Sequence, residues 1–122
     1  MDSASFATAR DLFQRALQQH GAGQLRDAET SYRESLQHLP GRPSTLTNLG
    51  AVLLQLGRPA EALPLLEQAL QSEPDNAEAL SHRALALAEL GRDAEALTAF
   101  DGLLTVGLGT AAVHYHRALC LA

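Results

Sequence analysis

Apolar residues recur along this chain at the spacing of helix faces. One set occupies the i, i+3, i+4 and i+7 positions of a single face: Leu46, Leu49, Gly50 and Leu53. Gly57 is placed to end this helix, and the fixed φ of Pro59 suits the first turn of the next one. A second stripe follows, made of Ala62, Leu66, Ala69 and Leu70, and Pro74 ends it. The stretch therefore predicts a helical hairpin whose two apolar stripes face each other.

The same hairpin is repeated along the chain. The segment that begins at Gly57 with Gly, Arg, Ala, Glu, Ala and Leu returns at Gly91, 34 residues later. The spacing resembles the tetratricopeptide repeat, whose period is 34 residues. The resemblance is carried by Leu46, Leu49, Gly50, Leu53, Ala62, Leu66 and Pro74. It implies an all-α fold, a right-handed α-solenoid of three helix-turn-helix hairpins plus a seventh helix.

The repeat register divides the chain into units. We expect a single domain over residues 1–122, with repeats at about 9–42, 43–76 and 77–110. Residues 111–122 are expected to form either the first helix of a fourth repeat or a capping helix. Stacked repeats normally end in a polar cap, so the apolar residues at 119–121 favour an array that continues beyond this sequence.

The first and third repeats depart from the middle one. Repeat one is expected to have helices at 5–20 and about 25–39. In this repeat, Arg15 stands at the position that Leu49 occupies in the middle repeat. In repeat three, Leu108 stands where the other repeats have proline, and Thr110 is expected to cap the helix that follows.

Composition supports an all-α chain and narrows the classes of function. The 122 residues include no Ile, Trp or Lys, and the formal net charge is −5. The arginines are scattered, so the sequence offers no basic patch for nucleic acid, and no apolar run is long enough to span a bilayer.

Cys120 is the one cysteine, which favours a reducing compartment, and we expect a cytoplasmic location. The lack of Lys and Ile suggests a GC-rich, bacterial genome.

Three motifs suggest chemistry, and each has a simpler structural interpretation. On a helix, His114 and His116 are about 200° apart and cannot hold one metal ion. The segment 107–112 matches the relaxed dinucleotide fingerprint, but the residues before it continue a helix in repeat register. Cys120 is interpreted as an apolar packing residue. We therefore expect no catalytic residues, no cofactor and no metal.

The remaining candidate is a surface. Tetratricopeptide arrays are similar in placing the first helix of each repeat on the inside of a superhelix. The resemblance then implies a polar row made of Gln14, Asn48, His82 and His116. A small or apolar row beside it is made of Leu17, Ala51, Leu85 and Leu119. Arg10, Gln55 and Glu89 extend the partner-binding groove, with Phe13 and Tyr115 as anchors near its two ends.

By resemblance, the function is protein–protein interaction, with a partner peptide or segment in this groove. Two alternatives remain open: a recruiting segment of a larger enzyme of the glycosyltransferase or methyltransferase type, and self-association through the apolar C-terminal helix. Some tetratricopeptide domains hold the carboxylate terminus of chaperones with a basic clamp. Asn48 fits that clamp, but Glu78 would repel a carboxylate, so we predict no binding to acidic chaperone tails.

Overall fold

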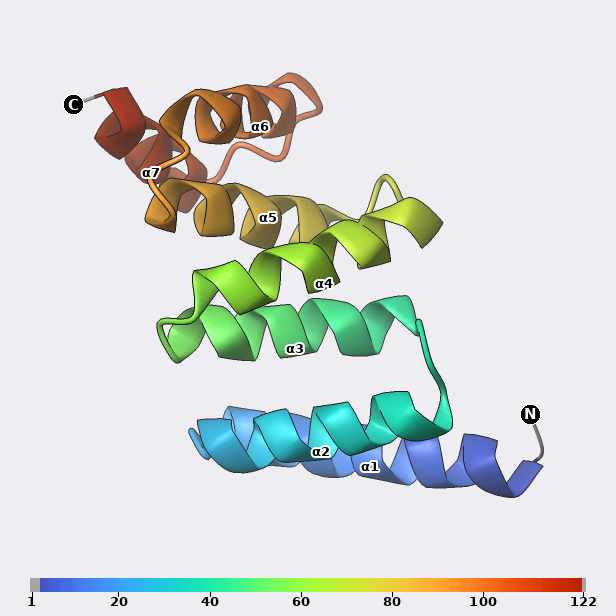
Figure 1. The fold of residues 1–122 in the computed structure, drawn as a ribbon. Helices are drawn as coiled ribbons and strands as arrows, with labels where there is room; N and C mark the ends of the chain where they lie inside the picture. The colour runs from blue at the N-terminus through green and yellow to red at the C-terminus, as the bar shows by residue number, and fades with distance from the viewer. Residues whose placement is uncertain (1–2, 122) are drawn as a thin grey trace.

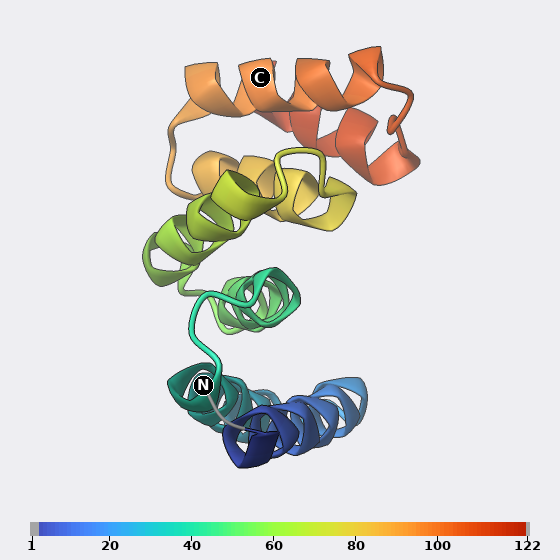
Figure 2. The ribbon, with the colours of Figure 1, turned by 90° about the vertical axis from the view of Figure 1, so that its right-hand side faces the viewer.

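The computed structural model describes residues 3–121, and within that range every regular element is an α-helix. The helices are α1 (Ser3–Gly21), α2 (Leu25–His38), α3 (Pro43–Gln55), α4 (Pro59–Ser72), α5 (Ala77–Glu89), α6 (Asp93–Thr105) and α7 (Ala111–Leu121). They stack as antiparallel hairpins from α1–α2 at one end to α6 and α7 at the other (Figure 1). The helix axes turn along the stack (Figure 2). This is the predicted solenoid of three hairpins plus a seventh helix.

The predicted helix ends are confirmed. Gly57 and Gly91 have φ of +75° and +77°, in the left-handed region that residues with a Cβ rarely adopt. Gly107, with φ of +81°, follows α6 in the same way. The segment 107–112 therefore runs from the turn after α6 into the start of α7, and the strand that a dinucleotide fingerprint requires does not precede it.

Side-chain N-caps begin two of the helices, and one of them is the predicted Thr110. The Asn76 side-chain oxygen accepts a hydrogen bond from the Ala79 amide at 3.1 Å, which satisfies one of the free donors at the start of α5. The Thr110 hydroxyl oxygen accepts a hydrogen bond from the Val113 amide at 3.3 Å, at the start of α7. Local sequence thus sets where these helices begin.

The core is built from the predicted stripes. Tyr32, Leu66 and Phe100 stand at the same repeat position on α2, α4 and α6, and each is at most 1% exposed. Opposite positions in the first helix of each repeat hold only small residues: Ala16, Gly50 and Ala84. A large side chain on the second helix thus faces a small one on the first, which lets the two helices of a hairpin approach closely.

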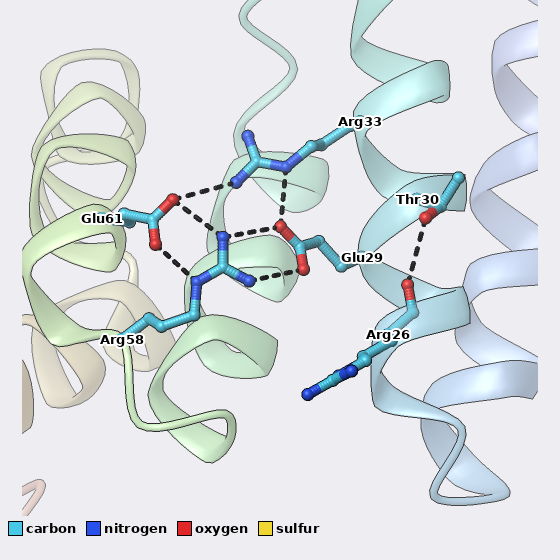
Figure 3. A network of polar contacts seen from close by, with 6 residues as sticks. All are labelled: Arg26, Glu29, Thr30, Arg33, Arg58 and Glu61. Carbon is cyan, nitrogen blue, oxygen red and sulfur yellow. Dashed lines mark hydrogen bonds and ion pairs between the residues drawn. The ribbon is translucent and has the colours of Figure 1, made fainter.

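A network of charges joins the first hairpin to the second on α2 and α4 (Figure 3). Two Arg58 Nη atoms donate to the two carboxylate oxygens of Glu29 at 2.7 and 3.0 Å. Arg58 also donates to Glu61 at 2.8 Å, and Arg33 donates to Glu29 at 3.0 Å. The Glu29 side chain is only 15% exposed. Glu29 is therefore the half-buried centre of a link between repeats.

Glu29→Gln is expected to lower the free energy of unfolding by about 1 to 2 kcal/mol near pH 7, since a hydrogen bond to a charged group contributes roughly that much. The Arg58 guanidinium holds the pKa of Glu29 below its ordinary value. The stabilisation is present above the ordinary carboxyl pKa and is lost as pH falls through the lowered pKa.

Urea unfolding at about pH 7 and about pH 3 measures this effect. The difference between the wild type and Glu29→Gln should shrink on acidification. Glu34→Gln, an exposed position on the same helix, serves as control and should match the wild type at both pH values. A Glu29→Gln deficit of the same size at both pH values would contradict the assignment.

Candidate functional site

A pocket of about 690 Å³ lies on the face formed by the first helix of every repeat. It is lined by His20 of α1, by Asn48, Ala51, Leu54 and Gln55 of α3, by Glu78, His82, Leu85 and Glu89 of α5, and by His116 of α7. Amide, imidazole and carboxylate groups therefore line the pocket together with aliphatic side chains, from four helices that are far apart in the sequence.

A second pocket of about 250 Å³ adjoins the first. The two pockets share Leu85, Glu89 and His116. The smaller one adds Ala88, Asp93, Leu119 and Cys120. We call the two pockets together the groove. It runs from the end of α1 across α3 and α5 to α7.

Hydrogen bonds fix the wall of the groove beside α1. His20 Nε2 lies 2.7 Å from Gln55 Oε1, and because that oxygen only accepts, the imidazole nitrogen is the donor. His20 Nδ1 is then free to accept from the Tyr32 hydroxyl at 3.4 Å. Burial raises the pKa of Tyr32 to about 12, and a hydrogen bond from Asn48 opposes that shift. The chain of contacts ties α1, α2 and α3 together at one rim.

The histidines of the groove have different surroundings. Burial lowers the pKa of His82, with a smaller opposing effect from the charge of Glu78, so this imidazole is neutral near pH 7. The His116 ring stacks on Phe100 with 6.2 Å between centroids and 11° between planes. Within residues 3–121, no three His, Cys, Asp or Glu side chains are grouped so that they could hold a metal ion.

The structure brings together most of the residues predicted for the groove. Seven line the larger pocket: Asn48, Ala51, Gln55, His82, Leu85, Glu89 and His116. Leu119 lines the smaller one. The shared face of α3, α5 and α7 that the resemblance implies is therefore hollowed by two adjoining pockets.

The predicted residues of α1, and Tyr115, lie outside the two pockets. Phe13 is half-buried against the Tyr32 ring, and the Arg42 guanidinium lies 4.6 Å from its centroid. Tyr115 is 62% exposed. The others of this set are Arg10, Gln14 and Leu17, all exposed. The contribution of α1 to the groove comes instead from His20, at its C-terminal end.

Three residues that line the groove were not predicted from the sequence: His20, Leu54 and Ala88. The three stand at the same repeat position, because 54 − 20 and 88 − 54 both equal the repeat period. Each of them lines one of the two pockets. Their spacing by one repeat period is a signal in the sequence that could have identified them as a third row of groove residues.

Fold and groove together define a helical-repeat protein with one hollowed face. A family model described as tetratricopeptide repeat matches residues 47–112, which is more than half of the sequence. The chain belongs to the tetratricopeptide repeat family. A comparison with curated proteins finds no match.

Solved structures of tetratricopeptide domains are similar to this chain. The Arabidopsis OM64 TPR domain has a TM-score of 0.88 and 18% identity, covering 95% of this chain and 96% of that one. The first TPR domain of Spaghetti (RPAP3), bound to the HSP90 peptide SRMEEVD, has a TM-score of 0.86 and 18% identity, covering 94% and 91%. YrrB, described as having an unusual peptide-binding site, has a TM-score of 0.86 and 23% identity, covering 97% and 60%. At these identities the likeness shows the fold.

Helix α7 leaves an apolar face exposed. Ala118 and Leu121 are exposed, whereas Ala84 and Leu87, one repeat earlier, are fully buried beneath a following helix. Self-association through α7 stays a prediction, as do the recruiting role in a larger enzyme and the cytoplasmic location. Among the helices of residues 3–121, none combines the length and the apolar character that crossing a bilayer requires.

Proposed function

We propose that this chain is a protein-interaction module that binds an extended or helical segment of a partner in the groove. The observation that carries the proposal is the lining of the larger pocket. Side chains that hydrogen-bond, such as Asn48 and Gln55, lie beside aliphatic side chains such as Leu54 and Leu85. That combination suits a peptide, whose backbone needs donors and acceptors while its side chains need apolar surface.

The fold adds support of a weaker kind. One similar structure holds an HSP90 peptide, and another is described as having a peptide-binding site. Fold alone does not determine function, so the proposal is based on the groove of this chain and on its own residues. It involves binding without a catalytic step.

The test blocks the groove without adding a charge. Ala51 is half-buried on α3 and lines the larger pocket, so Ala51→Tyr places a phenol ring in the space proposed for the peptide. Peptides selected from a random displayed library on the wild-type protein should bind Ala51→Tyr at least about tenfold more weakly, because their contacts at the centre of the groove are lost.

The matched control is Ala94→Tyr, the same substitution at an exposed position of α6 that lies outside both pockets. It should bind the selected peptides as the wild type does, and thermal unfolding should show both variants folded. Equal peptide binding by the wild type and a folded Ala51→Tyr, or no enrichment of any peptide over an unrelated protein, would overturn the proposal.

A further inference from the structure

The charges of the groove are all of one sign. Its lining includes three carboxylates, Glu78, Glu89 and Asp93, and no arginine. Within residues 3–121 none of the three takes part in an ion pair. Since His82 is neutral near pH 7, it does not offset their charge. A partner segment in the groove therefore meets three carboxylates that no arginine of the lining neutralises.

The arginines of the chain that make ion pairs are held elsewhere. Arg33 and Arg58 pair with glutamates on α2 and α4, and Arg117 pairs with Asp101. Arg92 lies in the turn between Glu89 and Asp93, but its guanidinium is held by Glu95 at 2.8 and 2.9 Å. The cation nearest in sequence to these two carboxylates is thus already engaged.

The smaller pocket is where this charge meets an apolar floor. Glu89 is the last residue of α5 and Asp93 is the first of α6, and both line the pocket. Leu85 and Leu119 supply aliphatic surface beside them. Cys120 lines the same pocket as Asp93 and adds to its largely apolar surface. The result is an apolar slot with two carboxylates at its rim.

We infer that this slot takes an arginine or lysine side chain of the partner, so that the segment bound in the groove is basic. The long aliphatic stem of such a side chain packs on Leu85 and Leu119, and its cationic end reaches Glu89 and Asp93. The planar guanidinium can donate to two carboxylates at once, which favours arginine over lysine. The inference rests on the proposed peptide-binding function and specifies its ligand.

The experiment uses the same displayed peptide library. Peptides selected on the wild type should be enriched in Arg and Lys relative to the unselected library. The variant Glu89→Gln with Asp93→Asn should bind them about tenfold more weakly, and replacing the basic residue of a selected peptide with glutamine should have the same effect. The double variant should bind the glutamine-substituted peptide no more weakly than either change alone allows, because both changes remove the same interaction.

The matched control is Asp27→Asn with Glu34→Gln, which removes two exposed carboxylates from α2 and changes the net charge equally. It should leave peptide affinity unchanged, so a loss shared by both double variants would show a general charge effect and overturn the inference. The acidic tetrapeptide EEVD, which has no basic residue, should show no binding at micromolar concentration, and micromolar binding would likewise contradict the inference.

The two proposals can fail separately. Suppose that the selected peptides lose binding to Ala51→Tyr, yet carry no basic enrichment and bind Glu89→Gln with Asp93→Asn normally. The groove would then be the binding site, and the inference of a basic partner would be wrong. If instead Ala51→Tyr binds every selected peptide as the wild type does, the groove itself is not the site.

Discussion

Replacing Gly50 with valine is expected to lower the free energy of unfolding by about 3 kcal/mol, at the upper end of the cost of overpacking a core. A Cβ added at Gly50 would lie 2.7 Å from Leu66 Cδ2 and 2.8 Å from its Cγ. Leu66 is fully buried, so it has no free space into which it can move. Relief of the clash requires α3 and α4 to separate.

Two further variants show that contact, and not helix propensity, is the cause. Gly50→Ala gains about 1 kcal/mol of helix propensity but still clashes, so it should be destabilised by about 1 kcal/mol. Gly102 lies inside α6 with nothing within 4 Å of an added Cβ. Gly102→Ala should therefore be more stable than the wild type by about 0.5 to 1 kcal/mol. Urea unfolding compares all three, and a stabilised Gly50→Ala would contradict the close approach of the helices.

Phe100→Ala is expected to have the largest effect of any single substitution considered, a loss of about 3 to 5 kcal/mol. The ring is 1% exposed at the centre of α6 and stacks on His116 of α7. Domains of this size are typically stable by only about 5 to 15 kcal/mol, so a large share of the total would be lost. Chemical unfolding measures the loss, and Phe6→Ala on α1, where the ring is 54% exposed, should cost less than about 1 kcal/mol.

The loss of stability in Phe100→Ala should also be confined to the helices near Phe100. In a solenoid each repeat contacts only its neighbours, and α7 packs against α5 and α6. Amide hydrogen exchange in Phe100→Ala should therefore quicken in α7 much more than in α3. Equal acceleration in both helices would show that the array unfolds as one cooperative unit and that Phe100 does not specifically hold α7.

Local sequence was enough to predict the helices, their ends and their register. These features depend on short-range chemistry. Gly57 and Gly91 end helices because the turn requires a positive φ, which glycine adopts easily. Asn76 begins α5 because its side-chain oxygen accepts a hydrogen bond from the Ala79 amide. The resemblance to the tetratricopeptide repeat then implied the α-solenoid and the shared face of α3, α5 and α7, where the groove lies.

Which positions of that face meet across the hairpins became visible only in the folded structure. The sequence could not show that His20 closes one rim through Gln55, or that Phe13 packs against Tyr32 outside the pocket. Nor could it show that Asp93, on a second helix, joins Glu89 at the smaller pocket. The reason is physical. The turn from one hairpin to the next is set by how side chains of neighbouring repeats pack, and a small rotation there changes which of several equivalent rows faces the groove.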